Sequence, residues 1–241
     1  MRATFDATGH VLVVTGGASG IGAAVAQEYA AAGGHAVVLD VAEGPSGDGV
    51  EHVHVDVADR DAVHAAVEQI VDRHGRIDGL VAGAAVQPRV PVLEMDAETW
   101  RRTLAINLDG VVWACQAVVP HMVRRRSGSV VAFASGLART GHAEASAYAA
   151  SKAALVAFLQ SLAAEVADHR VRVNTVFPGV IDTPQMRAAN PPGPEYEKWL
   201  RTTGVGVAAD VVGPLMYLMS DAATMTGSTL TRDRVFSKEE K

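Results

Sequence analysis

The sequence predicts a doubly wound α/β fold, in which a mostly parallel seven-stranded sheet carries helices on both faces. Two observations support this fold class. Short apolar, β-branched segments alternate with longer helical stretches along the whole chain, the order typical of repeated βαβ units. The 241 residues, 49% of them hydrophobic, suit one domain with a full core. We therefore expect residues 1–241 to form a single domain, with a substrate lid at about 184–207 and a short tail at 234–241.

The first half of the chain repeats the order strand, turn, helix. A β-branched run predicts a strand at 10–15, a glycine-rich turn follows, and an alanine-rich stretch predicts a helix over 23–32 that stops at Gly33 and Gly34. A buried strand is expected at 36–40, because all but its last residue are apolar. Apolar residues at helical spacing predict an amphipathic helix over 59–74.

The strand expected at 50–55 carries His52 and His54 at period two, which is typical of an exposed strand face. Two histidines on one face could begin a metal site, but no third ligand is spaced to join them. We therefore expect no metal site.

The second half continues the alternation. Apolar runs predict strands at 77–81, 128–134 and 172–177, and a last strand is expected within 226–233. Long helical patterns predict helices over 99–125, 147–166 and 209–220. The segment 184–207 is rich in proline, glycine and polar residues, so it is predicted to be a mobile lid that carries substrate contacts.

Charge and cysteine content exclude several classes of protein. A net charge of −6 and an isoelectric point near 5.8 argue against general affinity for nucleic acid or anionic membrane. The single Cys115 permits no intrachain disulfide and no thiolate metal site. We expect no apolar leader and no membrane-spanning run, and therefore predict a location in the cytoplasm.

The first turn has the composition of a phosphate-binding loop. It contains Gly16, Ser19, Gly20, Ile21 and Gly22, directly after a strand and before a helix. Glycines allow the backbone to approach a pyrophosphate, whose charge is met by free N–H groups at the helix N-terminus. A glycine-rich turn without a ligand is the alternative interpretation of this motif alone.

Asp40 ends the second predicted strand, where an acid can accept hydrogen bonds from both adenosine ribose hydroxyls. The same charge would repel a 2′-phosphate, and no Arg or Lys lies between Arg2 and Arg60 to offset it. The sequence therefore favours NAD over NADP.

Tyr148 and Lys152 lie one helical turn apart, so their side chains share a helix face. A neighbouring lysine is expected to favour the phenolate and lower the tyrosine pKa, which would suit proton transfer. Ser135 follows the apolar strand just upstream. Asn107 lies inside a predicted helix, where asparagine is mildly unfavourable, which suggests a specific role.

Together, Thr-Gly-x-x-x-Gly-x-Gly at 15–22, Ser135 and Tyr-x-x-x-Lys at 148–152 resemble the short-chain dehydrogenase/reductase family, which has a Rossmann fold. The resemblance extends from about Gly9 to Asp233. It implies hydride transfer between a secondary alcohol or ketone and NAD, with Tyr148 as the acid/base. Lys152 would hold the nicotinamide ribose, and Asn107 would position a water.

The resemblance also implies further cofactor contacts. Asp56 and Val57 match residues that contact adenine, and Ala82 stands at a position beside the cofactor. Pro178, Gly179, Ile181 and Thr183 match a segment that holds the nicotinamide carboxamide. Relatives of this kind commonly associate through two long helices, so a homotetramer is expected, with a homodimer as the alternative.

The chain departs from the family pattern at two places. Ala82-Gly83-Ala84-Ala85 replaces the usual Asn-Asn-Ala-Gly, and Arg234-Val235 stands where the last strand commonly ends in two glycines.

Two other functions remain open at this stage. One is a non-catalytic dinucleotide-sensing or scaffold protein on the same fold. The other is a dehydratase or epimerase, which would normally need a larger C-terminal substrate domain, and this chain has no room for one. The substrate itself is left open. Candidate pocket residues are Val86, Leu137, Ala138, Val180 and Met186, with Gln87, Arg89, Arg139, His142, Glu144 and Arg187 as polar anchors.

Overall fold

The computed structural model describes residues 4–232, and it contains the predicted seven-stranded parallel sheet. The strand order is β3-β2-β1-β4-β5-β6-β9, so the order reverses between β1 and β4. The strands are β1 (Val11–Thr15), β2 (His35–Asp40), β3 (Val50–His54), β4 (Gly79–Ala82), β5 (Gly128–Phe133), β6 (Val171–Phe177) and β9 (Thr229–Thr231). This arrangement confirms the fold class. Arg234, Val235 and the tail at 234–241 lie outside the described residues.

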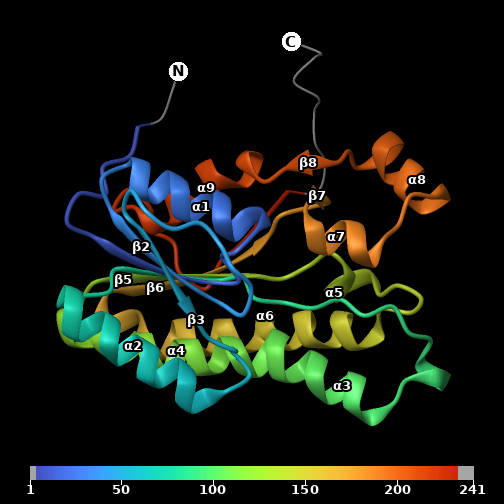
Figure 1. Ribbon diagram of the computed structural model, residues 1–241, viewed down its shortest axis with the longest axis horizontal. Coiled ribbons are helices and arrows are strands. Elements are labelled where there is room, and N and C mark those ends of the chain that lie inside the picture. Colours follow the sequence, from blue (N-terminus) through green and yellow to red (C-terminus); the bar gives the residue numbers. More distant parts are fainter. Residues whose placement is uncertain (1–3, 233–241) are drawn as a thin grey trace.

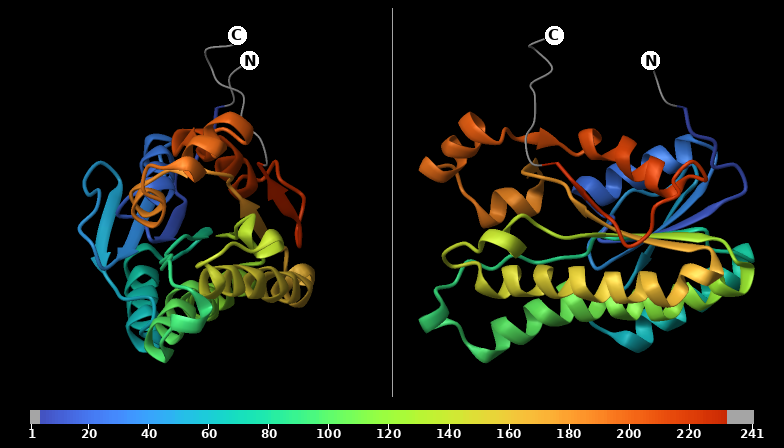
Figure 2. Two further views of the ribbon diagram at one scale, coloured as in Figure 1. Left: turned by 90° about the vertical axis from the view of Figure 1, so that its right-hand side faces the viewer. Right: turned by 180° about the vertical axis from the view of Figure 1, so that it is seen from behind.

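Helices cover both faces of this sheet (Figure 1). On one face lie α1 (Gly20–Ala31) and α9 (Ala209–Met219), and on the other lie α2 (Arg60–His74), α4 (Gly110–Arg125) and α6 (Ser146–Val166). Figure 2 shows α4 and α6 alongside each other on that second face. Side chains alternate along each strand, so Leu12 packs toward α1 and α9 while Val13 packs toward the other helices. The result is two apolar layers with the sheet between them.

Local sequence explains where α2 begins and ends. Asp59 caps its N-terminus, where the carboxylate accepts a 3.0 Å hydrogen bond from the Ala62 amide. Gly75 ends it in the left-handed conformation, with φ of 72°. Both signals are visible in the sequence, and the predicted bounds agree to within one residue.

The long helix predicted at 99–125 is interrupted. It consists of α3 (Ala97–Leu104), a π turn at Ala105–Asp109 and then α4. A π turn places one extra residue in the helix and often occurs at functional sites. Here it carries Asn107.

The segment 184–207 is more ordered than its composition suggested. It forms α7 (Pro184–Ala189) and α8 (Pro194–Thr202), and a small two-stranded sheet of β7 (Ile181–Asp182) and β8 (Gly206–Val207) closes its base. Thr183 caps α7 by accepting a 3.2 Å hydrogen bond from the Met186 amide. The short elements α5 (Leu137–Thr140), η1 (Val92–Glu94) and η3 (Ala167–His169) complete the helical content of the described residues.

Two helical stretches, Ala97–Arg125 and Ser146–His169, reach the length and hydropathy of a membrane span, which the sequence prediction did not anticipate. Both pack against the sheet, and side chains from each belong to its apolar core. Core helices of globular domains meet the same criterion, so length and composition alone do not make these helices membrane spans.

Candidate active site

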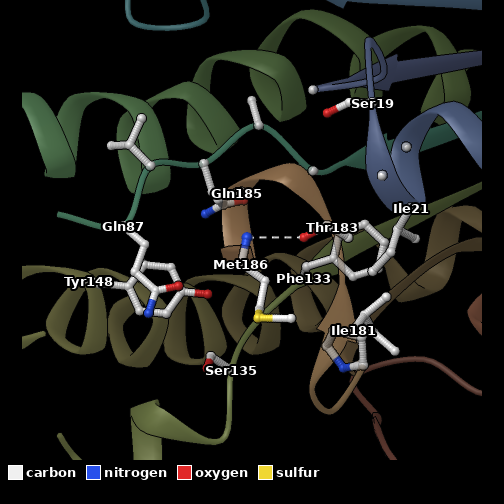
Figure 3. Close-up of a pocket in the computed structure, with 18 of the residues that line it drawn as sticks. Ser19, Ile21, Gln87, Phe133, Ser135, Tyr148, Ile181, Thr183, Gln185 and Met186 are labelled. Carbon is white, nitrogen blue, oxygen red and sulfur yellow. Dashed lines mark hydrogen bonds between the residues drawn. The ribbon is translucent and has the colours of Figure 1, made fainter. Parts of the chain in front are cut away.

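A cavity of about 640 Å³ lies across the carboxyl ends of the strands, at the point where the strand order reverses. Figure 3 shows Ser19 and Ile21 at one side of this cavity and Tyr148 and Ser135 at the other, with Thr183 and Met186 between them. Its wall includes most of the residues that the sequence predicted: Gly16, Ser19, Gly20, Ile21, Gly22, Asp40, Asp56, Val57, Ser135, Tyr148, Lys152, Pro178, Gly179, Ile181 and Thr183.

The glycine loop allows a close backbone approach that other residues would block. Gly16 has φ of 70°, and a Cβ atom there would lie 2.5 Å from the backbone nitrogen of Ala84. A Cβ at Gly22 would lie 2.4 Å from the Gly16 carbonyl oxygen. The N-terminus of α1 opens onto this loop, so its backbone amides and dipole favour an anionic ligand.

Two carboxylates lie beyond the loop. Asp40 accepts hydrogen bonds of 3.0 Å from the amides of Ala18 and Ala42, which fix both of its oxygens at the end of β2. Glu43 lies on the same part of the wall. This part of the site carries negative charge that the protein backbone orients.

Asp56 differs because it has a cationic partner. Its carboxylate accepts 2.9 Å hydrogen bonds from the Ala58 amide and from Arg102. Burial opposes ionisation of Asp56, but these two bonds outweigh it and lower its pKa. No sequence pattern marks Arg102 as a wall residue, because it comes from α3 and only the folded chain brings it beside Asp56.

Ser135, Tyr148 and Lys152 lie together at the other end of the cavity. Ser135 follows β5, and Tyr148 and Lys152 project from successive turns of α6. Lys152 is only 2% exposed, and its Nζ donates a 2.8 Å hydrogen bond to the Phe133 carbonyl. That nitrogen lies 5.8 Å from the centre of the Tyr148 ring. A phenol, a hydroxyl and an amine therefore share one wall.

The pKa values of this group are set mainly by burial. Burial raises the pKa of Tyr148, although the Ser135 hydroxyl and the Arg89 charge act in the opposite direction. Burial also lowers the pKa of Lys152 to about 8. Desolvation therefore dominates the Tyr148 pKa and raises it, opposite to the predicted direction, while the Lys152 nitrogen bonds the Phe133 carbonyl.

Asn107 and Ala82 lie behind the cavity wall. The Asn107 amide is fully buried and forms paired bonds with Val86, accepting from its amide at 2.8 Å and donating to its carbonyl at 2.9 Å. It also donates to the Ser151 hydroxyl at 3.1 Å. Ala82 is the last residue of β4, and the wall begins at Gly83. Asn107 therefore fixes the loop that carries Val86, and its predicted water contact stays a prediction.

Thr15 attaches the loop that follows β4 to β1. The Gly83 amide lies 2.9 Å from the Thr15 carbonyl oxygen and 3.2 Å from its hydroxyl. The loop at 82–85 is thus attached to β1 by backbone and threonine contacts.

The predicted substrate residues that reach the cavity wall are all uncharged. Val86, Gln87, Leu137, Val180 and Met186 lie on the wall, whereas Ala138 does not. Neither do the charged or ionisable candidates Arg89, Arg139, His142, Glu144 and Arg187. Wall residues that no sequence pattern singled out include Thr140, Gln185, Asn190, Trp199, Thr203 and Arg232.

Arg89 and His142 attach the lid to the body of the protein. Arg89 donates to the Asn190 side chain and, at 3.2 Å, to the Ala189 carbonyl at the end of α7. His142 and Arg89 both contact Glu195 at the start of α8. These contacts hold the lid over the cavity, so both residues act as lid contacts in this conformation.

Arg232 was also missed. Its side chain bonds Asp210 at 3.1 Å and lies 3.5 Å from the Pro178 carbonyl, while its own amide bonds the Phe177 carbonyl at 2.9 Å. It joins β9, the 178–179 turn and the base of the lid. No local motif marks this role.

Comparison with known proteins agrees with this geometry. Residues 10–193 match the family model for short chain dehydrogenases, so the chain belongs to that family. It is an oxidoreductase of this class, whose members use nicotinamide cofactors.

Three relatives show how far the similarity extends. D-threitol dehydrogenase of Mycolicibacterium smegmatis is 38% identical over 95% of this chain and 93% of its own. Cis-4-hydroxycyclohexanecarboxylate dehydrogenase of Sinomonas cyclohexanicum is 36% identical over 93% and 95%. The ligand-free structure of Thermoplasma acidophilum aldohexose dehydrogenase superposes with a TM-score of 0.85 at 30% identity, covering 94% of this chain and 92% of that one.

Proposed function

We propose that the protein is an NAD-dependent dehydrogenase that transfers a hydride between an uncharged secondary alcohol, or its ketone, and the nicotinamide ring. The observation that carries the proposal is the shared cavity: the glycine loop and Asp40 lie at one end, and Ser135, Tyr148 and Lys152 at the other. NAD, when bound, supplies the hydride acceptor or donor. The protein supplies position and proton transfer.

The residues fit a dinucleotide. The backbone cradle at Gly16 and Gly22 has no space for side chains, and the N-terminus of α1 offers amides to a pyrophosphate. Asp40 would accept from the ribose hydroxyls. Pro178, Gly179, Ile181 and Thr183 also line the cavity, with Thr183 beside Gly20, and would contact the nicotinamide.

Tyr148 would exchange a proton with the substrate oxygen, since its phenol is the titratable hydroxyl on the substrate side of the cavity. The raised pKa keeps it protonated at neutral pH, ready to donate during ketone reduction. The Ser135 hydroxyl would donate a hydrogen bond to the same oxygen as negative charge develops. Lys152 would hold the nicotinamide ribose and, when charged, favour the phenolate needed for alcohol oxidation.

NAD is preferred over NADP because of the charges near the adenosine end. Asp40 and Glu43 line the wall beside the end of β2, and a 2′-phosphate held there would bring further negative charge close to both carboxylates. Arg102, the cation on this part of the wall, is already paired with Asp56. We infer that binding NADP would cost more electrostatic energy than binding NAD.

The substrate end favours a neutral molecule. Its side chains are apolar or uncharged polar groups: Val86, Gln87, Leu137, Thr140, Gln185, Met186, Asn190, Trp199 and Thr203. A charged substrate would find no free counter-ion among these groups and would lose its hydration. Hydroxyl groups beside the reacting carbon could bond to Gln87, Gln185 or Asn190, so a cyclic alcohol or small polyol suits this surface.

Tyr148→Phe tests the proposal. It removes the transferable proton while keeping the ring, so we expect kcat to fall by about 10² to 10⁴-fold, with NAD affinity unchanged within a few-fold. Tyr217→Phe is the matched control, because Tyr217 lies on α9, is 38% exposed and is not on the cavity wall. Retention of more than a tenth of wild-type kcat would refute the role of Tyr148.

The same assay separates catalysis from dinucleotide sensing. A panel of neutral cyclic alcohols and polyols is offered with NAD, and NADH formation is followed. Binding of NAD without turnover of any alcohol would favour the sensing or scaffold function instead. We further propose a homotetramer in the cytoplasm.

A further inference from the structure

A second cluster of chemically reactive side chains lies at the opposite end of the sheet from the cavity. His35 begins β2, Glu51 lies near the start of β3, and His74 is the last residue of α2. The parallel pairing of β2 with β3 sets Glu51 beside Val37, two residues after His35. The three elements meet at the amino ends of the strands, near the β3 edge of the sheet (Figure 1).

One ring nitrogen of each histidine in this cluster has no hydrogen-bond partner among the described residues. Nε2 of His35 and Nε2 of His74 are both buried and unpaired. Each faces the same carboxylate oxygen, Oε2 of Glu51, at 3.6 Å and 3.7 Å respectively. These separations are too long for hydrogen bonds, and unpaired buried polar atoms are costly.

The spacing matches the ligands of a metal ion. One ligand atom from each of the three residues lies within 4.8 Å of the other two. Tetrahedral zinc with bonds of about 2.0 to 2.2 Å separates neighbouring ligand atoms by roughly 3.3 to 3.6 Å. The observed 3.6 Å and 3.7 Å, which join each histidine nitrogen to the Glu51 oxygen, need only a small contraction to reach that geometry, and the two histidine nitrogens lie within 4.8 Å of each other.

We propose that His35, Glu51 and His74 form a transition-metal site, with Zn²⁺ as the ion that fits best, linking β2, β3 and α2. Two imidazoles and one carboxylate are a ligand set that zinc accepts, with a fourth position left for water. A hollow of about 340 Å³ beside both histidines has room for that water. His52 and His54, the histidines that the sequence singled out, are not members of the cluster.

One neighbouring feature supports the site. Arg73 holds Oε1 of Glu51, so the carboxylate is oriented and Oε2 remains directed at the histidines, as outer partners of metal ligands commonly arrange. The alternative is a simple ion pair between Glu51 and protonated histidines, which would bind no metal.

Titration of chelator-treated protein with Zn²⁺ distinguishes the metal site from the simple ion pair. We expect one Zn²⁺ per chain by calorimetry, and an unfolding temperature that rises with Zn²⁺. His74→Ala and Glu51→Gln each remove a ligand. Loss of even an outer partner of a ligand typically costs about 10- to 100-fold in metal affinity, so both variants should weaken binding at least 10-fold.

His54→Ala is the matched control, since His54 is an exposed histidine on the same strand as Glu51. It should bind Zn²⁺ like the wild type. NAD-linked activity and circular dichroism report whether each variant is folded, because the cluster lies away from the cavity. Absence of Zn²⁺ uptake by the wild-type protein, or unchanged uptake by folded Glu51→Gln, would overturn the proposal.

Discussion

Replacing Lys152 with methionine should stabilise the protein at neutral pH while removing its activity. Lys152 is buried, and no carboxylate accounts for its perturbed pKa, which burial alone lowers from 10.5 to about 8. One pKa unit corresponds to about 1.4 kcal/mol, so the buried charge costs about 3 kcal/mol of folding free energy at pH 7. Methionine has a similar length and carries no charge, so it avoids this cost.

Part of the gain is lost with the hydrogen bond to the Phe133 carbonyl, which contributes about 1 kcal/mol. We therefore expect Lys152→Met to be more stable by about 2 kcal/mol at pH 7. The difference should shrink with rising pH. Below pH 8 the lysine is charged in both the folded protein and the unfolded chain. Between about pH 8 and 10.5 it is neutral in the folded protein but still charged in the unfolded chain. Wild-type stability therefore recovers over that range.

Urea unfolding of both proteins without cofactor, at pH 7 and near pH 10, measures this difference. Lys198→Met is the control, because Lys198 is exposed on α8, and it should show little change at either pH. A Lys152→Met variant that is less stable than wild type at pH 7, or a stability difference that does not change with pH, would contradict this prediction.

Other predictions follow from the cavity and its surroundings. Asp40→Ala should shift the NADP-to-NAD ratio of kcat/KM by more than about 10-fold toward NADP, because hydrogen bonds to charged groups contribute about 1.5 to 3 kcal/mol; a wild type that already prefers NADP would contradict this. Gly83→Asn, alone or with Ala82→Asn, should lower the melting temperature. A Cβ at Gly83 would lie 3.1 Å from the Thr15 carbonyl oxygen, and overpacking costs about 1 to 3 kcal/mol. A higher melting temperature would show instead that the fold still accommodates the asparagine side chains that the family usually carries here. Glu195→Gln should loosen the lid and raise KM for the alcohol more than it lowers kcat, which steady-state kinetics would check against Glu197→Gln on the same helix. Light scattering at micromolar concentration should give a tetramer mass, and a monomer would contradict the proposed assembly.

The fold was predictable where local signals and tertiary packing agree. The helix α2 has its cap at Asp59 and its glycine at Gly75, and both remain local features in the structure. The region 99–125 shows the limit of such patterns, because apolar spacing does not reveal the extra residue of a π turn. Segment 184–207 shows another limit: its proline and glycine content suggested a loop, yet Thr183 and Pro184 begin a helix.

Some residues of the site could be placed from the sequence and others could not. Residues that follow parallel strands, such as Asp40 and Ser135, could be placed together from sequence because those strand ends meet at one edge of the sheet. Arg102, Trp199 and Arg232 could not, because each reaches the cavity through packing between elements far apart in the chain. The pKa of Tyr148 was also beyond the sequence, since it depends on how much water the fold removes from the phenol.

The π turn at Ala105–Asp109 is the place in this region where the chain can change its length. Each residue in an α-helix turns the chain by about 100°, so an extra residue in a regular helix would rotate α4 relative to α3 by that angle. The π turn absorbs this residue, which keeps Val111, Val118 and Met122 in the core and lets Asn107 form its paired bonds to Val86. Deletion of one residue from the turn should therefore keep the register of α4 but displace Asn107, so that the damage falls on the loop beside the cavity, whereas a deletion within α4 itself would turn core residues away from the sheet.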